Sequence, residues 1–398
     1  MDIKNAAKEN QEKENINIVL QEEAKPLFKD QQILIDNLKI SSYQNFSIGI
    51  NEYTSCYEIF NLKNNINKNS FYIAYCSKNE EIIICKYDYI MKQKEELFND
   101  KKTAKKIKYF YDPLSKNEYL FISGDNILLR YLIKNEKEYE CVEEYKKEGS
   151  IGDFAVSTAF LPIYNFEIFY NKFEQKNYLI ISYLYQRGCM SKRNDIDILT
   201  FEDNKLNVIK SFFYQTIYEN KLFLLYEDNL SKSYYLIIYI NNTIKYIEIN
   251  NDIINRYENN EQITNFFDLI NNIDNLYRKL FCEYGYVFYG NNKNDLLLLS
   301  DRYGTILIID LNAKQLIKTL ELKNSINSIY DYNDNKIMLG LNNSIAIVDV
   351  NLSKIITKYK FDFKNNESLI SVKKYICEDN DTHFILIDGS DEKIRLLY

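Results

Sequence analysis

The sequence predicts an all-β fold built from repeated units, because one pattern of apolar runs and turns occurs twice between Leu296 and Phe361. In each copy an apolar run leads through a turn to a second apolar run that ends at an aspartate, Asp310 or Asp349. The two aspartates lie 39 residues apart, which is close to the period of a four-stranded propeller blade. The repeat therefore predicts a closed radial array of sheets, and we expect a seven-bladed β-propeller.

The same template fits five further stretches of the chain. Short apolar strands separated by turn residues suit a closed ring of sheets better than a sandwich, and the uneven spacing places insertions in loops. The expected strands are 56–60, 71–76 and 82–87; 107–111, 119–123, 127–133 and 139–145; 154–161, 178–184, 196–201 and 206–212; 222–226, 234–240, 243–249 and 253–257; 282–289, 296–299, 306–309 and 316–320; 337–339, 345–348 and 355–359; and 369–375, 384–387 and 394–398.

The two ends of the chain predict how the ring closes. Residues 1–29 are polar and charged and are interpreted as a flexible tail, which leaves residues 30–398 for the propeller. The segment 33–40 is the first strand candidate, and it has no sheet-forming neighbour directly after it. The C-terminal unit has only the middle strands of a repeat before the chain stops. We therefore expect 33–40 to pair with 394–398, which would remove two exposed sheet edges.

Two insertions are evident. The stretch near 91–108 carries a run of Lys and Glu, which is typical of a solvated loop or an outer strand. In the stretch 258–280, apolar residues recur at helical spacing from Ile263 to Leu280. This spacing predicts an amphipathic helix between the fourth and fifth blades, and its apolar side is expected to pack on its own domain.

Composition narrows the classes of function. The net charge of −7 argues against a nucleic-acid binder, whose domain is normally basic on one face. A polar N-terminus and the lack of a long apolar run predict no signal peptide and no membrane span. The seven cysteines are odd in number and have no CxxC spacing, so we expect buried, reduced thiols in a cytoplasmic protein. They are Cys56, Cys76, Cys85, Cys141, Cys189, Cys282 and Cys377.

The stretch from Ser300 to Leu311, SDRYGTILIIDL, resembles the C-terminal half of a WD repeat, and 389–398 and 123–132 are similar. This resemblance implies a platform for protein assembly. The chain departs from the family because it has no tryptophan and no Gly-His pair, so the buried Asp-His-Ser-Trp network cannot form. We therefore expect Ile, Leu, Tyr and Phe packing to hold the blades together. Another propeller family or a different blade count remains an alternative. The tryptophan position is occupied by Tyr87, Tyr131, Ile247, Ile309, Val348 or Leu397.

Catalytic motifs are missing from the sequence. His383 is the only histidine, and no nucleophile signature surrounds it, so it is interpreted as structural. The acidic loop 378–381 lacks the spacing of a calcium site. Gln186-Arg187-Gly188 is one arginine short of the Arg-Arg-Gly element of phosphoinositide-binding propellers, and no glycine-rich phosphate loop is present. We therefore assign no catalytic, cofactor-binding or metal residues.

These observations predict a non-catalytic scaffold for protein–protein interaction, as a subunit or adaptor of a larger intracellular or cytoskeletal assembly. The expected partners are other proteins, and nucleic acid, small molecules and integral membrane association are not expected. One alternative is a propeller enzyme whose carboxylates converge at the central channel. Another is a phosphoinositide or membrane-lipid sensor that uses Arg187, Lys192 and Arg193 as a basic loop.

Overall fold

The structure is a computed structural model, and its description covers most of the chain from residue 56 onward together with 46–47. The described ranges are 46–47, 56–63, 69–77, 80–88, 93–149, 159–187, 191–202, 205–216, 222–240, 243–250, 261–262, 267–268, 284–289, 295–301, 303–322, 324–333, 336–350, 354–360, 369–376, 383–389 and 393–397.

Strands are the only regular elements among these residues, and they form mainly antiparallel sheets that largely follow the order of the chain. One sheet comprises β2 (Tyr57–Phe60), β3 (Ser70–Cys76), β4 (Ile82–Asp88) and β5 (Gln93–Asp100), and the next comprises β6 (Lys106–Tyr111), β7 (Glu118–Ser123), β8 (Leu128–Asn135) and β9 (Glu138–Tyr145). A five-stranded sheet follows, with β12 (Ile163–Asn171), β13 (Lys176–Arg187), β14 (Ser191–Glu202), β15 (Lys205–Thr216) and β19 (Glu261–Gln262).

The remaining sheets complete the chain. They are β16 (Phe223–Asp228), β17 (Ser233–Ile240), β18 (Thr243–Ile249) and β20 (Phe267–Asp268); β21 (Tyr284–Phe288), β22 (Leu296–Ser300), β23 (Thr305–Asp310) and β24 (Gln315–Glu321); and β25 (Ile326–Asn333), β26 (Lys336–Leu341), β27 (Ser344–Asp349) and β28 (Lys354–Lys360). The last is β29 (Leu369–Ile376), β30 (His383–Gly389), β31 (Lys393–Leu397) and β1 (Phe46–Ser47), and a separate pair is β10 (Glu148–Gly149) with β11 (Ala159–Phe160).

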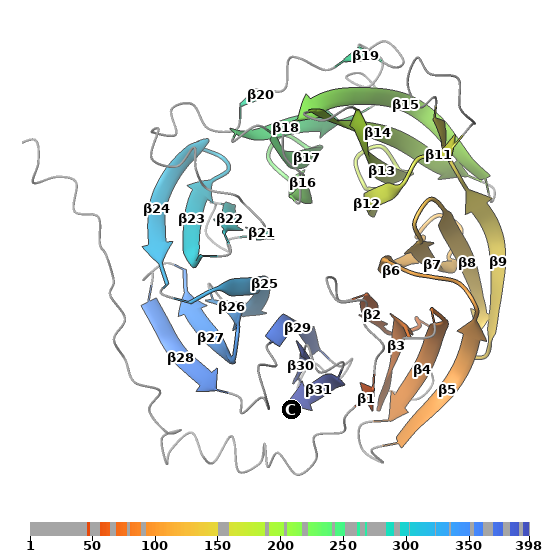
Figure 1. Cartoon of the computed structure of the whole chain (residues 1–398), viewed down its shortest axis with the longest axis horizontal. Coiled ribbons are helices and arrows are strands. Elements are labelled where there is room, and N and C mark those ends of the chain that lie inside the picture. The colour runs from red at the N-terminus through yellow and green to blue at the C-terminus, as the bar shows by residue number, and fades with distance from the viewer. Residues whose placement is uncertain are drawn as a thin grey trace, which may run out of the picture.

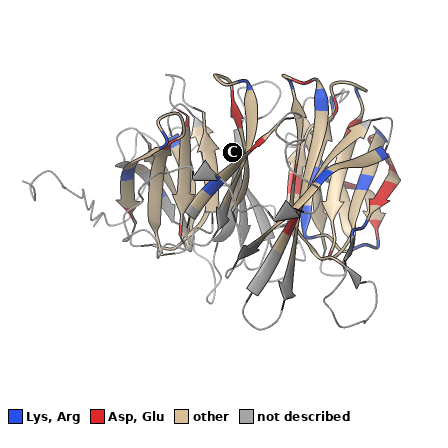
Figure 2. Ribbon diagram, turned by 90° about the horizontal axis from the view of Figure 1, so that it is seen from above, with Lys and Arg blue, Asp and Glu red and all other residues tan. Residues whose placement is uncertain are grey.

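The sheets stand around a common axis, with the first strand of each sheet innermost, so the chain is an all-β propeller (Figure 1). Contacts between successive inner strands run from β2 through β6, β12, β16, β21 and β25 to β29. Seen from the side, the strands run between two faces that carry the loops, with basic and acidic positions interspersed (Figure 2). Loops on these faces can vary while the strands keep the frame.

The second strand of a sheet is buried on both of its sides, because the neighbouring sheets cover both. Every residue of β3, β7 and β22 is buried, as the continuous apolar runs in their sequences require. Outer strands differ, since β5 exposes most of its charged side chains. The stretch near 91–108 therefore contains the outer strand β5 over 93–100. This is the second of the two alternatives that the sequence allowed, a solvated loop or an outer strand.

The expectation of a seven-bladed propeller needs correction, because only six of the described sheets have the four strands of a regular blade. The β12–β15 sheet differs from them by a fifth strand, β19, which pairs in parallel with β15. Its innermost strand was also misplaced at 154–161, because the actual strand β12 begins after Pro162 and its pairing with β13 shifts register near Asn165. A register shift hides the simple alternation that marks a strand in sequence.

The predicted helix in 258–280 is wrong for the residues that the structure describes there. These are the short strands β19 and β20, and β20 pairs with the outer edge of β18, at Phe267 with Tyr246. Pairing satisfies the edge hydrogen bonds of β18, which a helix would leave open. The strand expected at 253–257 lies outside the described residues.

Closure by the predicted N-terminal segment is likewise not supported. The segment 33–40 lies outside the described residues, as does the whole of the tail expected at 1–29. The strand that pairs with β31 is instead the two-residue β1, with Phe46 opposite Ile394.

Candidate functional site

One turn pattern recurs in three neighbouring sheets, at the hairpin between the innermost strand and the next. A side-chain oxygen of Asp112, Asn171 or Asp228 accepts the backbone N–H two residues further on, at 2.8–3.0 Å. The fourth residue after each of these caps is left-handed, with φ of 61°, 55° and 56°. An Asx cap offsets part of the steric cost of that conformation by satisfying the turn's backbone. The left-handed residues are Lys116, Gln175 and Lys232.

A fourth copy of the pattern closes the turn between β23 and β24. Asp310 accepts the N–H of Ala313 at 2.8 Å, and Lys314 has a φ of 53°. In an antiparallel sheet the first and third turns lie at the same end, so all four turns belong to one face of the propeller. We call this the hairpin face, defined by the turns 112–117, 171–176, 228–233 and 310–315 together with Tyr289.

Apolar side chains stand at the tips of the hairpin face. Leu114 is 49% exposed, Leu230 is 78% exposed, and Tyr289, directly after β21, is 47% exposed. The caps turn their polar groups inward to the backbone, which leaves the next side chains pointing outward. Exposed apolar residues that gather on one face mark a contact surface more often than single scattered ones do.

Four tyrosines form a wall between the β16–β18 sheet and the β21–β24 sheet. Tyr226 stacks on Tyr235 and on Tyr289, with ring centroids 6.0 Å and 6.2 Å apart. Tyr235 meets Tyr246 edge-on at 5.5 Å. Because each tyrosine comes from a different strand or turn, stacking fixes the spacing of the two sheets at this end.

Three tyrosines of this wall, Tyr226, Tyr235 and Tyr246, line a partly open cavity of about 310 Å³ on the hairpin face. The hydroxyl of Tyr226 donates to Asp295 at 3.0 Å, and the Lys314 ammonium donates to the hydroxyl of Tyr246 at 2.7 Å. The Lys314 nitrogen also lies 4.8 Å from the centre of the Tyr246 ring. The residues that line the cavity are Tyr226, Asp228, Leu230, Ser231, Tyr235, Ile237, Tyr246, Leu311, Asn312 and Lys314.

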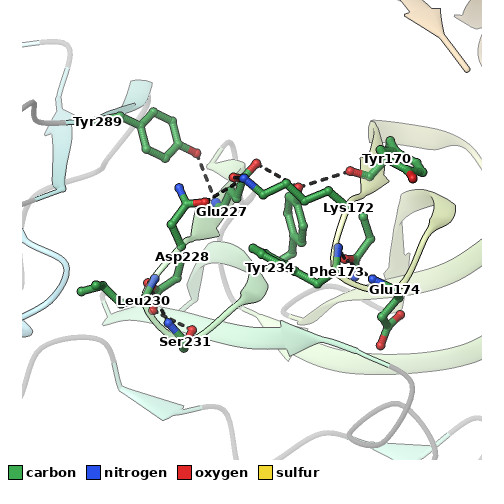
Figure 3. A network of polar contacts seen from close by, with 12 residues as sticks. Tyr170, Lys172, Phe173, Glu174, Glu227, Asp228, Leu230, Ser231, Tyr234 and Tyr289 are labelled. Atoms are coloured by element: carbon green, nitrogen blue, oxygen red, sulfur yellow. Dashed lines mark hydrogen bonds and ion pairs between the residues drawn. The ribbon is translucent and has the colours of Figure 1, made fainter. Parts of the chain in front are cut away.

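A polar network beside the cavity ties three sheets together (Figure 3). Lys172 reaches from the β12–β13 turn and pairs with Glu227 at 2.5 Å. Tyr234 donates to the other oxygen of Glu227 at 2.8 Å, and the backbone N–H of Glu227 donates to the hydroxyl of Tyr289 at 3.1 Å. One glutamate therefore joins the β12–β15, β16–β18 and β21–β24 sheets, and it holds the rim of the cavity in place.

Burial raises the pKa of three tyrosines of the site. Burial, and after it the Asp295 carboxylate, raises the pKa of Tyr226 well above its ordinary value. Burial also raises the pKa of Tyr235 and of Tyr289. A tyrosine whose pKa is raised stays protonated at neutral pH and acts as a hydrogen-bond donor. These groups are therefore suited to binding, and a proton-transfer role at neutral pH is disfavoured.

Charged groups also join the innermost strands β6 and β12. Lys106 donates to Glu167 at 2.8 Å and to Asn165 at 2.5 Å, and Lys108 pairs with the second oxygen of Glu167. Burial lowers the pKa of Lys106 to about 8, against the opposing effect of Glu167. Burial acts to raise the pKa of Glu167, but the two lysines outweigh it and the pKa lies below its usual value. This carboxylate is ionised and paired, which does not suit a general acid.

Among the described residues, those considered for chemistry from the sequence do not line this site. His383 is the first residue of β30, opposite Ile376, and 378–381 lies outside the described residues. On the β13–β14 hairpin, Lys192 pairs with Gln186 and Arg187 with Ser191, which places their backbones at one end of the sheet. The basic-loop hypothesis is not tested by this placement.

The described cysteines are free thiols, and not all of them are buried as the sequence predicts. Cys56, Cys76 and Cys85 are free and buried, whereas Cys141 is exposed on the outer strand β9, so the expectation of buried thiols is wrong at that position. Cys189, Cys282 and Cys377 lie outside the described residues. Within the described ranges, no three His, Cys, Asp or Glu side chains gather as a metal site would require. Among those residues there is also no helix of a length and apolarity fit to cross a bilayer.

The ring of sheets defines the class of fold, which is a β-propeller. No family model matches the chain, and no curated protein does either. Solved structures do match, and they are WD40-type propellers. The resemblance drawn from the turn and strand pattern is therefore confirmed for the fold.

Three of these structures illustrate the likeness. BBS1N in complex with ARL6DN matches with a TM-score of 0.59 at 9% identity, covering 88% of this chain and 94% of that one. Sqt1 of Saccharomyces cerevisiae matches with a TM-score of 0.51 at 8% identity, over 89% of this chain and 99% of that one. A chain of the mitotic checkpoint complex matches with a TM-score of 0.53 at 10% identity, over 89% of this chain and 95% of that one. Identities this low establish a shared fold alone.

Sequence reasoning missed the hairpin face, although a signal for it exists. Each turn has Asp or Asn at the end of one strand and Lys or Gln four residues later, before the next strand begins. This spacing is typical of a capped turn whose fourth following residue is left-handed. The tyrosines of the wall could not have been grouped from sequence, because Tyr226 and Tyr289 meet only across two sheets.

Proposed function

We propose that this protein is a non-catalytic scaffold that binds other proteins through its hairpin face, as a subunit or adaptor of a larger cytoplasmic assembly. The proposal places the docking surface on the propeller and keeps residues 1–29 as a polar tail. The observation that carries it is the exposure of Leu114, Leu230 and Tyr289 on one face whose polar turn groups are already satisfied internally.

The neighbouring folds support this role in general terms. BBS1N is seen in complex with ARL6DN, and another neighbour is part of the mitotic checkpoint complex. A propeller offers a rigid frame whose loops can change independently. The alternative of a channel enzyme is disfavoured by Glu167, which is paired with Lys106 and Lys108. For the phosphoinositide alternative, the described residues supply no favouring observation.

A pair of double variants tests the proposal. Full-length tagged protein is purified under native conditions from its own cells, and the recovered complex is sized and identified by mass spectrometry. Leu114→Ser with Leu230→Ser removes apolar side chains from the hairpin face. Ile317→Ser with Ile356→Ser removes similarly exposed side chains from the outer strands. We expect the first pair to lose the partner and the second to retain it. A wild-type chain that purifies as a monomer without a partner would contradict the scaffold role.

A further inference from the structure

The hydroxyl groups of the cavity are bound to other groups of the protein. Tyr226 donates to Asp295 at 3.0 Å, and Ser231 donates to Asp228 at 2.7 Å. The Ser231 oxygen also lies 3.2 Å from the hydroxyl of Tyr235. Burying a polar group is costly when it loses its hydrogen bonds, so an occupant can cover these hydroxyls without supplying a new partner.

Charged groups of both signs lie at the cavity. Asp228 and Lys314 line it, and Asp295 lies beside it, where it accepts from Tyr226. The Lys314 nitrogen lies 4.8 Å from the centre of the Tyr246 ring, so a lysine of the chain itself makes the cation–π contact on that ring. An anionic occupant would approach two carboxylates, and a cationic occupant would compete with Lys314 for the ring. An uncharged occupant meets neither obstacle.

Apolar and aromatic groups supply the contact surface of the cavity. Leu230, Ile237 and Leu311 line it together with the three tyrosines. Its volume of about 310 Å³ is at the small end for a binding pocket, so it suits one large side chain. Aromatic rings attract one another beyond the area that they bury, so the tyrosines favour an aromatic side chain over an aliphatic one. Leu230, which is 78% exposed, also belongs to the hairpin face, so a partner docked on that face reaches the cavity.

We propose that the partner protein inserts one uncharged aromatic side chain into this cavity when it docks on the hairpin face. The inference rests on the scaffold role and specifies the anchor residue of the partner at that face. Burial of the aromatic ring against the tyrosines and the aliphatic side chains supplies the affinity. The charges at the cavity select against a charged anchor of either sign.

Four N-acetyl amino-acid amides, those of tryptophan, leucine, lysine and glutamate, test the chemistry of the anchor on the full-length protein. Titrations followed by saturation-transfer NMR measure the affinities, which are expected to be weak for a single side chain. We expect the tryptophan amide to bind at least about threefold more tightly than the leucine amide and at least about tenfold more tightly than either charged amide. Its affinity should change less than about twofold between about 0.05 M and 0.5 M salt, because no ion pair forms.

Matched variants locate the binding. Leu230→Ser and Asn312→Trp change the cavity, whereas Ile317→Ser and Tyr303→Trp make similar changes at exposed positions elsewhere. We expect the cavity variants to weaken binding of the tryptophan amide at least about threefold and the other two to change it less than about twofold. The chain has no tryptophan of its own, so emission at a shorter wavelength from Asn312→Trp than from Tyr303→Trp would show that the cavity takes an aromatic ring. Thermal melts check folding, and Leu230→Ala or Asn312→Phe replaces a variant that does not fold.

The native complex links the cavity to the partner. Asn312→Trp fills the cavity from within the chain, so we expect it to lose the partner that Tyr303→Trp retains. The inference is overturned if the leucine amide or a charged amide binds as tightly as the tryptophan amide, if the two sets of variants lose equal affinity, or if the complex survives Asn312→Trp. Each of these results leaves the scaffold role standing. A wild-type chain that purifies without a partner would instead contradict the scaffold role itself.

Discussion

Two interfaces between neighbouring sheets hold the propeller together in different ways. Between the β6–β9 and β12–β15 sheets, charged and aromatic side chains are buried together. Between the β21–β24 and β25–β28 sheets, the buried cluster is almost entirely aliphatic. The chain lacks the tryptophan and the Gly-His pair of a typical WD repeat throughout, so both interfaces must replace the same missing network.

The polar interface is centred on Asp197 in β14, which is 1% exposed. Its carboxylate accepts from Lys147 at 2.5 Å, from the hydroxyl of Ser211 at 2.5 Å and from the hydroxyl of Tyr145 at 3.1 Å. Lys147 and Tyr145 belong to the neighbouring sheet and its connection. A buried charge with three donors is tolerated, but it depends on every one of them.

The aliphatic interface has no such dependence. Leu298 and Ile306 from one sheet and Ile337, Leu339 and Ala346 from the next are all 0% exposed in one cluster. Their contribution comes from apolar burial and close packing, which is not directional. The comparison indicates that directional polar contacts stabilise one side of the ring, whereas close apolar packing stabilises the other. Substitutions at each interface can distinguish these two contributions.

The largest expected effect is at the polar interface. Asp197→Ala removes an acceptor of the Tyr145 hydroxyl and the nearer of the two carboxylates beside Lys147, since Asp195 stays at 3.9 Å, and we expect the free energy of unfolding to fall by about 3–5 kcal/mol. Urea denaturation followed by circular dichroism measures the loss. The control is Asp125→Ala, whose ion pair with Lys105 is exposed and worth at most about 1 kcal/mol. A loss at Asp197 no greater than the control would show that the buried pair does not hold this interface.

A core truncation at the aliphatic interface comes next. Leu298→Ala removes a fully buried side chain and leaves a cavity, so we expect a loss of about 3 kcal/mol within the usual range of roughly 2–5 kcal/mol. Ile317→Ala in the outer strand of the same sheet is the control, because Ile317 is 53% exposed and should cost less than about 1 kcal/mol. Equal losses for the two variants would contradict an interface held by packing density.

The same contrast explains what could be predicted from the sequence. Strands β22, β23, β26 and β27 were located correctly because their apolar runs are continuous and end at Asp310 and Asp349. The expectation that aliphatic and aromatic packing would replace the missing network holds for this side of the ring. Such runs need only local sequence to be recognised, since burial on both sides of a strand leaves no polar position.

The other side of the ring was predicted less well. Glu167 lies within β12, where its pairing with Lys106 and Lys108 allows charge in an innermost strand. From sequence alone that charge argues against a strand, and the strand was placed at 154–161 instead. The candidate site escaped prediction for a similar reason, because its tyrosines and turns meet only between sheets. Contacts of this kind depend on the register and order of distant strands.

A third prediction concerns Lys106 in the innermost strand β6, on the polar side of the ring, where the free energy of unfolding should depend on pH. The unfolded-state pKa of Lys106 is about 10.5 and burial lowers the folded-state pKa to about 8, so between these values the unfolded chain binds more protons. Stability from this group therefore rises with pH through that window and is constant below it. We expect the wild type to gain on the order of 1 kcal/mol over Lys106→Met between about pH 7.5 and pH 9.5. Parallel pH profiles of the two proteins, measured by urea denaturation, would contradict this assignment.

The smallest expected effect is at Arg130, which is 1% exposed in β8. Its guanidinium pairs with Glu143 at 3.0 Å and lies 5.4 Å from the centre of the Tyr119 ring and 5.7 Å from that of Phe201. Unlike Asp197, it leaves behind a partner that keeps one hydrogen bond, because Glu143 accepts the backbone N–H of Leu206 at 3.0 Å through Oε1, whereas Oε2, which faces the guanidinium, has no hydrogen-bond partner among the described residues.

Arg130→Met therefore separates charge from volume within the polar interface itself. Methionine keeps most of the apolar contact with the two rings, and it removes the desolvation cost of a buried cation. We expect the free energy of unfolding to change by less than about 1 kcal/mol, measured by urea denaturation, whereas Arg130→Ala should cost about 2–3 kcal/mol because it also empties the space. A loss with methionine as large as with alanine would mean that the charge is needed, and the polar interface would then depend on the cation as well as on Asp197.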